Sequence, residues 1–596
     1  MVQTFIRATI GCTALLGVAA AGAEAPADLI YRNGTIYTAD AANHVVEALA
    51  VRDGKVAYAG TGAGVAALTG PATRVIDLNG RFVMPGLIDG HLHPLSGGAG
   101  LLKCNLNYER LTKDALRERL AACIAASRNQ EPDGWLEVVN WFQEGALPAG
   151  TTFSAADLDS LKTARPIQIM SSFGHTMLLN RRGMALAKLH RQSADPVGGR
   201  IARDADGEPT GILEDKAYEP VVALLPKPTP ETDLASARAA LEALRRQGVT
   251  TFMDALATPD ALTAFTALAK GGELTARAHF AQEIAPADAA DPAAAVSRLV
   301  ALRARFDQGA MERAPGITVR NAKFFLDGVI TAPAMTGAML APYFVNQGTD
   351  AAPRWVPGTS TGPAVYFKPE PLKALVLALA EAGIEPHMHA DGDAAVRAAL
   401  DAYAALRATF PPERIRAAIA HNESVDPADY PRYRKLDAIP VLSLQWGKPA
   451  ADTVDGAKDT LGPVRWPRIE PSGALARAGA RIAFGSDWPV DPLDEWYALA
   501  VGVTRRAGPA ADGKYAGRLG TDPGLSRFEV LRAITINAAY QLHEETRLGS
   551  LEPGKFADFV LLDRNVLTVP EADIATTRVV ATVVGGKAVY DANAKL

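Results

Sequence analysis

The sequence predicts an α/β protein that combines a (β/α)8 barrel of the TIM type, carrying one insertion, with a small composite β-sandwich built from the N- and C-terminal segments. Eight strand-like segments end in polar residues, and helical stretches rich in Ala, Leu and Arg precede most of them, as in a barrel of alternating strands and helices. Short strands with hairpin turns occur only near the two ends of the chain, which predicts the sandwich.

The composition is that of a large globular protein. The chain has 596 residues, of which 48% are hydrophobic and 21% charged, and this balance argues against intrinsic disorder, collagen and coiled coils. Lys and Arg number 61 and Asp and Glu number 66, which gives a net charge of -5 without a dense basic block. We therefore expect no nucleic-acid partner, because binding of a polyanion requires a basic surface.

The first 23 residues have the three-part pattern of a secretory signal peptide. Arg7 is their only charge, an apolar and small-residue stretch follows it, and Ala21-Gly22-Ala23 forms a cleavage signal. The apolar run is shorter than the ~20 residues that a membrane span needs, so we expect cleavage and no stable membrane anchor. The mature protein is predicted to be exported, either to the periplasm or as a secreted protein.

Two cysteines, Cys104 and Cys123, remain after removal of the signal peptide. In an oxidising compartment they can form one bridge. The sequence leaves open whether they meet.

Turn signals divide the mature chain into modules. Asn-Gly and Asp-Gly turns lie near its N-terminus, and a Gly-Gly turn lies near its C-terminus. Because a few strands are unstable alone, we assign residues 27–84 and 545–596 to one composite β-sandwich. Residues 85–544 are then assigned to the barrel.

The barrel assignment rests on eight strand candidates. They cover residues 83–93, 249–255, 276–282, 317–328, 384–390, 416–421, 440–446 and 480–487. A ninth candidate, residues 166–175, is assigned to an insertion of about residues 98–220 between the first two barrel strands. A doubly wound open sheet is disfavoured because no G-x-G-x-x-G follows the first strand.

Histidines and an acid stand at the ends of predicted strands. His91 and His93 lie two residues apart at the end of the first strand, where alternation places both imidazoles on one side. His389, His421 and Asp487 each end another strand, and the carboxyl ends of barrel strands meet at one mouth. Four histidines and a carboxylate are ligands that suit zinc or a similar divalent ion.

Several segments match the motifs of a known group of enzymes. The chain resembles the amidohydrolase superfamily in VMPGLIDGHLHP, HADGD, the strand ending at His421, FGSDWPV and GSLEPGKFADFVLLD. It resembles, more narrowly, amidohydrolase family 3, which includes N-substituted formamide deformylases, in NAKFFLDG, SFGHTMLLN, DADGEPTGILED and LRAITINAAY. The resemblance covers nearly all of the mature chain and implies a metal-dependent barrel with a composite β-sandwich.

The resemblance also implies a ligand set. Its members are His91, His93, Lys323, His389, His421 and Asp487. The first two histidines are implied to bind the more buried metal and the last two a second metal. Asp487 is implied to bind the buried metal and to shuttle protons, while Lys323 lies on the strand that carries a bridging, often carboxylated lysine. The implied cofactor is a divalent metal, zinc by expectation, with one or two ions per chain.

The activity implied by the resemblance is hydrolysis of a carbon–nitrogen bond, of amide type and outside peptides, in a small organic molecule. A metal-activated hydroxide attacks the carbonyl, and Asp487 delivers the proton to the leaving nitrogen. His175 is implied to stabilise the oxyanion or to contact the substrate. The alternatives are an ester, lactone or carbamate hydrolase with the same site, a metal-assisted isomerase or lyase, and a non-catalytic binding protein on this fold. Homo-oligomerisation is left open.

Five residues are predicted to contact the substrate. They are Trp141, Phe173, Arg181, Trp446 and Trp488. The tryptophans are candidates for an aromatic pocket. Phe173 and Arg181 stand where many family members carry Asp and Ser, and this departure from the family favours a substrate with an aromatic or acidic group.

Polar residues near the ligands are predicted to have structural roles. His387 shares the strand face of His389 and is expected to pack against the pocket wall or to support a ligand. Asp391 and Asp393 are expected to cap the helix that follows them. Asp327 is interpreted as part of an Asp-Gly turn.

Overall fold

The computed structural model describes most of the chain. It covers residues 25–127, 134–148, 150–172, 174, 176–196, 199–332, 334–349, 352–509, 511 and 513–592. The predicted signal peptide, residues 1–23, lies outside this part of the chain. Among the residues covered, no helix combines the length and the apolar character that a membrane crossing requires.

An eight-stranded parallel sheet forms the centre of the molecule. Its order is β23-β22-β21-β20-β17-β16-β15-β8, and each neighbouring pair is parallel. The strands are β8 (Leu87–Leu92), β15 (Val249–Asp254), β16 (Arg277–Ile284), β17 (Ile317–Phe325), β20 (Glu385–Ala390), β21 (Ala417–His421), β22 (Ala438–Leu442) and β23 (Ala483–Phe484). All eight predicted strands take part, which confirms the predicted barrel.

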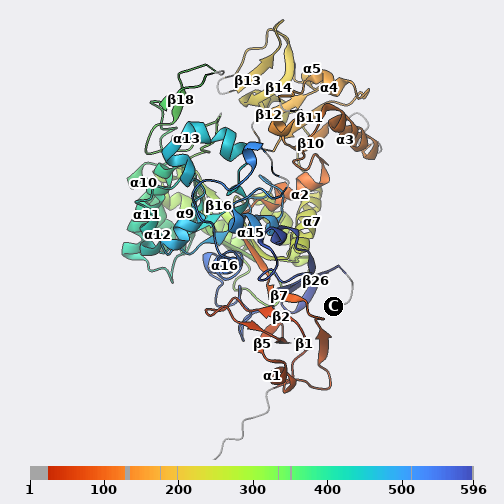
Figure 1. The fold of residues 1–596 in the computed structure, drawn as a ribbon, viewed down its shortest axis with the longest axis vertical. Helices are drawn as coiled ribbons and strands as arrows, with labels where there is room; N and C mark the ends of the chain where they lie inside the picture. Colours follow the sequence, from red (N-terminus) through yellow and green to blue (C-terminus); the bar gives the residue numbers. More distant parts are fainter. Residues whose placement is uncertain are drawn as a thin grey trace, which may run out of the picture.

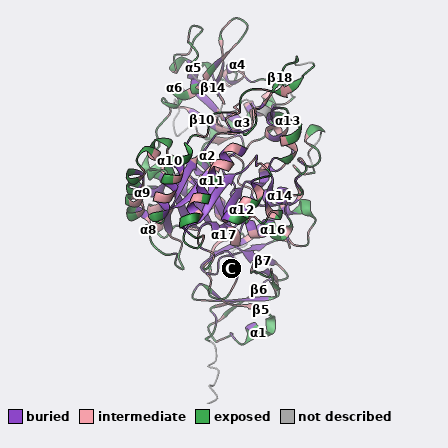
Figure 2. Ribbon diagram, turned by 90° about the vertical axis from the view of Figure 1, so that its left-hand side faces the viewer, coloured by how far each residue is buried: buried purple, intermediate pink, exposed green. Residues whose placement is uncertain are grey.

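Helices cover the outside of this sheet. They include α7 (Pro230–Gln247), α8 (Pro259–Lys270), α9 (Pro292–Phe306), α10 (Pro369–Glu381), α11 (Asp393–Thr409), α12 (Tyr430–Leu436) and α15 (Glu495–Thr504). Strands β15 and β21 are buried at every residue, as expected for a parallel sheet that is covered on both faces. Figure 2 shows the strands enclosed by helices with exposed outer sides.

The residues at both ends of α7, the longest of these helices, explain where the helix begins and ends. Thr229 caps α7 by accepting a hydrogen bond from the Thr232 N–H, and Pro230 occupies its first position. Gly248 ends the helix with φ 92°, a left-handed conformation that favours glycine. The chain then turns directly into β15, so this helix packs back on the sheet.

A separate six-stranded sheet, order β13-β14-β12-β11-β10-β9, lies between the first two barrel strands in sequence. Its strands are β9 (Cys104–Asn105), β10 (Leu136–Trp141), β11 (Ile167–Ser171), β12 (Thr176–Leu179), β13 (Gly199–Arg203) and β14 (Pro209–Asp215). The ninth strand candidate forms β11 and therefore belongs to this sheet and not to the barrel. We call this unit the insertion sheet.

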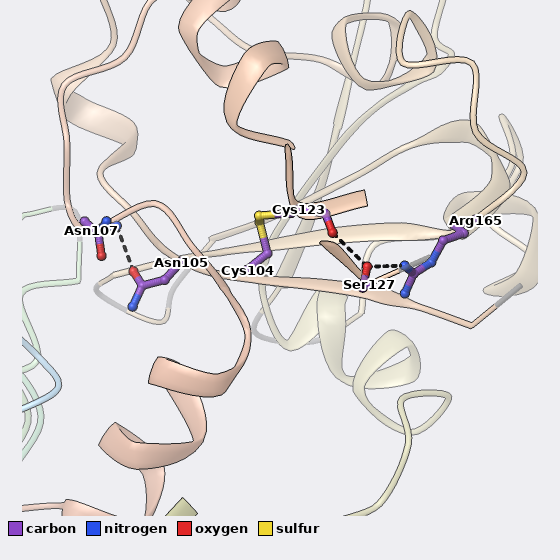
Figure 3. The surroundings of a disulfide bond; sticks show 6 residues. All are labelled: Cys104, Asn105, Asn107, Cys123, Ser127 and Arg165. Carbon is purple, nitrogen blue, oxygen red and sulfur yellow. Dashed lines mark hydrogen bonds between the residues drawn. A yellow bond between two sulfur atoms is a disulfide. The ribbon is translucent and has the colours of Figure 1, made fainter. Parts of the chain in front are cut away.

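A disulfide between Cys104 and Cys123 joins β9 to helix α3 (Lys113–Ala126) beside the insertion sheet (Figure 3). The end of the helix is fixed as well, because Ser127 donates to the Cys123 carbonyl and accepts a hydrogen bond from Arg165 (Figure 3). The two cysteines that the sequence left unassigned therefore meet.

Two further sheets are built from the terminal segments: the first contains N-terminal strands alone, and the second combines strands from both ends of the chain. The first sheet contains β1 (Leu29–Arg32), β4 (Ala48–Arg52), β5 (Lys55–Gly60) and β6 (Arg74–Asp77). The second sheet contains β2 (Thr35–Tyr37), β3 (Val45–Val46), β7 (Phe82–Pro85), β24 (Phe559–Leu562), β25 (Val579–Val584) and β26 (Lys587–Asp591). The C-terminal β24 pairs with the N-terminal β7, and residues of both sheets share one hydrophobic core. The composite nature of this unit is therefore confirmed.

These parts stand in a row, with the barrel between the insertion sheet and the terminal sheets (Figure 1). The chain runs from β7 in a terminal sheet through β8 and helix α2 (Pro94–Leu102) into β9 of the insertion sheet. The carboxyl end of β8 therefore faces the insertion sheet. Because the barrel strands are parallel, all eight carboxyl ends lie on that side.

A buried ion pair fastens the barrel to the terminal sheets. Arg277, at the start of β16, is fully buried and donates to Asp558 over 2.7 and 3.2 Å. Its guanidinium also lies 4.5 Å from the centre of the Phe556 ring and donates to the Glu312 carbonyl. Asp558 in turn accepts a hydrogen bond from the Gly585 N–H at 2.6 Å.

Removal of Arg277 tests this connection. We expect Arg277→Ala to lower the free energy of unfolding by about 3–5 kcal/mol, because it leaves a buried carboxylate without its cation. Arg238→Ala, which breaks an exposed pair with Glu273, is the matched control and should cost about 1 kcal/mol or less. Urea unfolding measures both, and equal losses in the two variants would contradict the structural role of Arg277.

Candidate metal centre

Two groups of side chains that are able to hold a metal ion lie at the carboxyl ends of the barrel strands. Site A consists of His91, His93 and Asp487, and site B of His389, Asp391 and His421. Within each group, one ligand atom per residue lies within 4.8 Å of the others. The two sites are neighbours, since the rings of His91 and His421 are 4.8 Å apart between centroids.

Site A joins the two edge strands of the barrel sheet. His91 belongs to β8 and His93 follows it, while Asp487 lies just after β23. The Asp487 Oδ1 atom is 3.4 Å from His91 Nε2 and 3.1 Å from His93 Nε2. Asp487 has a φ of 56°, and its N–H donates to the His91 carbonyl at 2.7 Å. The backbone that carries the carboxylate is thus held in an uncommon conformation by the ligand strand itself.

Asp89 braces site A from behind. This fully buried residue accepts hydrogen bonds from the His91 N–H at 3.1 Å and the Ser486 N–H at 3.0 Å, and a further one from the Ser486 hydroxyl. The two segments approach closely, because a Cβ on Gly485 would lie 2.4 Å from the Cβ of His91.

Two polar residues lie beside the histidines of site A, and His387 is within hydrogen-bond distance of one of them. His387 Nε2 lies 2.8 Å from His91 Nδ1, which fixes the outer nitrogen of that ring and leaves Nε2 facing Asp487. Asp254, the last residue of β15, has its Oδ1 atom 3.9 Å from His93 Nδ1. His387 therefore supports a ligand directly and does not merely pack against the pocket wall.

Site B is formed by β20, β21 and the loop after β20. The rings of His389 and His421 are 4.6 Å apart, and the Asp391 Oδ1 atom is 3.8 Å from His389 Nε2. His421 has a φ of 74° at the end of its strand. The Trp446 indole stacks on its imidazole at 5.4 Å, so this predicted substrate residue forms a wall beside site B.

The acids around site B differ from their predicted roles. Helix α11 begins after Gly392 without a side-chain cap, so the expectation that Asp391 and Asp393 cap it is wrong. Asp393 instead accepts the Leu340 N–H at 2.7 Å. Asp327 accepts the N–H groups of Asp391, Gly392 and Ala338, and it lies 3.4 Å from His389 Nδ1. Asp327 therefore links the loop after β17 to the loop after β20, a role that goes beyond the predicted Asp-Gly turn.

Lys323 is buried on β17 beside site A. Its Nζ atom lies 3.1 Å from His91 Nε2 and 4.8 Å from the centre of the Phe325 ring. Burial lowers the pKa of this amine to about 8, although Asp487, Asp391 and Asp254 oppose the shift. Lys323 thus interacts electrostatically with a carboxylate of each site.

The donor set fits divalent metal ions. Burial, reinforced by Lys323 and neighbouring histidines, holds the pKa values of His91 and His421 well below 6.5, so their imidazoles are neutral and retain a lone pair. The Oδ1 atoms of Asp487 and Asp391 and the Nδ1 atom of His389 are buried without a hydrogen-bond partner. Two histidines and one carboxylate per site are ligands that zinc accepts.

The other predicted substrate residues do not join these sites. Trp141 is 1% exposed in the core of the insertion sheet and packs edge-on against Phe153. The Trp488 ring is buried in the main core, where it covers Gly97 of α2. The structure places both indoles in packed cores, and their contact with the substrate stays a prediction.

The remaining predicted site residues belong to the insertion. The Arg181 side chain is 76% exposed and pairs with Asp159 at the surface, so its predicted substrate contact is not supported. The predicted catalytic residue His175 and the predicted substrate contact Phe173 lie outside the described residues.

Replacement of Asp89 tests the brace behind site A. We expect Asp89→Ala to weaken zinc binding at site A about 10–100-fold, since loss of an outer support usually costs that much affinity. Asp260→Ala, which removes an exposed acid from α8, should leave affinity unchanged. Zinc titration against a competing chelator measures the effect, and wild-type affinity in Asp89→Ala would disprove the supporting role.

The chain is similar to known proteins along nearly its full length. A model of the amidohydrolase family matches residues 74–590. The protein LONG AFTER FAR-RED 3 of Arabidopsis thaliana is 28% identical, over 95% of this chain and 92% of its own. The N-substituted formamide deformylase of Arthrobacter pascens is 24% identical, over 95% of this chain and 98% of its own.

A solved structure shares the fold. An uncharacterised metal-dependent hydrolase from Pyrococcus horikoshii superimposes with a TM-score of 0.68 at 23% identity, covering 91% of this chain and 99% of its own. The family match spans the barrel strands and both metal-ligating groups. The chain therefore belongs to amidohydrolase family 3.

Proposed function

We propose that the protein is an exported metal-dependent amidohydrolase that cleaves an amide-type carbon–nitrogen bond in a small organic substrate. The observation that carries the proposal is the pair of adjacent His/His/Asp groups at the mouth of the barrel. Zinc, the expected ion, would be held by His91, His93 and Asp487 and by His389 and His421. Divalent ions at such ligands acidify a water molecule and polarise a substrate carbonyl.

The protein's own groups supply proton transfer and positioning. The Asp487 carboxylate has an oxygen without a hydrogen-bond partner at the mouth, where it can accept a proton from the attacking water and return it to the leaving nitrogen. This transfer matters for amides, because an amide anion is a poor leaving group. Trp446 offers an apolar wall that excludes water and aligns the substrate.

The choice of a carbon–nitrogen bond is supported by the family. The relative from Arthrobacter pascens is a deformylase of N-substituted formamides, in which such a bond is broken. The same site is chemically able to hydrolyse an ester, lactone or carbamate, because a metal-activated hydroxide attacks any activated carbonyl.

Two observations support export. A secretory signal is predicted for residues 1–23, and the Cys104–Cys123 disulfide is typical of an oxidising compartment. N-terminal sequencing of the protein from a periplasmic or medium fraction should begin at Glu24. A chain that stays in the cytoplasm and begins at Met1 would refute export.

Carboxylation of Lys323 is part of the proposal. Its buried amine lies near carboxylates of both sites and beside His91, and a carbamate there would supply two anionic oxygens to bridge cations. With 13C-labelled bicarbonate, we expect a carbamate carbon resonance in metal-loaded protein that Lys323→Arg abolishes. Its absence from the metal-loaded wild type would contradict carboxylation.

The bond specificity can be measured with matched amides and esters. We expect metal-dependent amide hydrolysis that places 18O from labelled water in the product carboxyl group. Asp487→Asn should lower kcat by about 10²–10⁴-fold, the usual contribution of general acid–base catalysis. A wild-type rate in this variant, or activity confined to esters, would contradict the proposed mechanism.

A further inference from the structure

We propose that Asp391 is a ligand of site B, so that His389, His421 and Asp391 hold the second ion even when Lys323 carries no carbamate. This inference rests on the proposed function, because it requires metal at the barrel mouth. It concerns a residue that the sequence alone identified as a helix cap.

The position of Asp391 places its carboxylate with the two histidines. It follows His389 by two residues, just beyond β20, and its Oδ1 atom lies 3.8 Å from His389 Nε2. Ligand atoms of all three residues lie within 4.8 Å of one another. A metal ion that binds two histidines and a carboxylate needs donors grouped in this way.

The loop around Asp391 is fixed through its backbone. The Asp391 N–H donates to Asp327 at 3.0 Å, and its carbonyl accepts the Ser424 N–H at 2.9 Å. These contacts tie the residue to the strand-end loops after β17 and β21. The position of the side chain is thereby set in advance, as metal sites require.

The Asp391 carboxylate is poorly compensated, although Lys323 attracts it electrostatically. Asp391 is 2% exposed, and its Oδ1 atom has no hydrogen-bond partner. Its electrostatic neighbours include further acids, namely Glu423, Asp327 and Glu470. A buried carboxylate among like charges is costly unless a cation accompanies it. A divalent ion at the free oxygen supplies that cation.

The amine of Lys323 lies within hydrogen-bond distance of a ligand of the other site. Its Nζ atom is 3.1 Å from His91 Nε2 of site A. With Asp391 included, each site has two histidines and one carboxylate from the protein itself. A carbamate on Lys323 would then link two ions that are already bound, and the second ion would not depend on it.

The test counts metal in the full mature chain. Protein is stripped with a chelator and dialysed against a series of fixed free Zn²⁺ concentrations, and bound zinc is measured by elemental mass spectrometry. The wild type should bind two ions. Asp391→Asn should keep the first and bind the second at least about 100-fold more weakly, since a direct ligand contributes at least as much as an outer support.

Two further variants complete the design. Asp393→Asn alters the neighbouring acid and should bind two ions like the wild type. The Oδ1 atom of Asp393 accepts a hydrogen bond from a backbone N–H, and the side-chain oxygen of Asn can accept the same bond. Lys323→Ala should also bind two ions. If Asp391→Asn does not fold, the Lys323→Ala protein decides: two ions support the inference and one ion overturns it.

The outcomes separate the inference from the proposed function. A wild-type chain that binds no zinc defeats the proposed function, and the inference with it. A wild type with two ions and an Asp391→Asn variant with unchanged affinity defeats the inference alone. Loss of the second ion in Lys323→Ala also overturns it.

Discussion

The hydrogen bonds that join the carboxyl ends of β8 and β23 determine both the shape of the barrel and the position of its first metal-ligating group. These strands are the two edges of the eight-stranded sheet, and the loops beyond them carry the connection. Asp487 donates its N–H to His91, His93 donates its N–H to Trp488, and Asp89 binds Ser486. The same hydrogen bonds therefore close the sheet and assemble site A. A substitution that weakens these hydrogen bonds should disturb metal binding before it unfolds the barrel.

The electrostatics of the mouth follow from its burial. Neutral imidazoles, an amine of lowered pKa and carboxylates without hydrogen-bond partners are gathered where little water reaches. Each of these groups costs free energy when buried alone. Cations at sites A and B would offset much of that cost, so metal binding and stability of the mouth should be coupled.

The sequence predicted the barrel and the histidines because both depend on local periodicity. Alternation places His91 and His93 on one side of a strand, and strand-end positions bring His389, His421 and Asp487 to one mouth. The same rule identifies Asp254, which ends β15 but was missed among the other strand ends. Asp391 stands two residues after His389, yet a short acid before a helix predicts a cap equally well.

What the sequence could not predict depends on tertiary packing. Trp141 and Trp488 carry no local signal that separates a packed indole from one that meets substrate, and both are buried in cores. Trp446 is placed by its stacking on His421, a contact between two different strand ends. The support that His387 gives to His91 likewise joins residues 296 positions apart.

Anomalous scattering at the zinc absorption edge, from crystals of the mature protein loaded with zinc, tests the central claim most directly. Two peaks are expected, one among His91, His93 and Asp487 and the other among His389, Asp391 and His421. A map without a peak at either group, or with metal only elsewhere on the molecule, would contradict a metal centre at the mouth of this barrel.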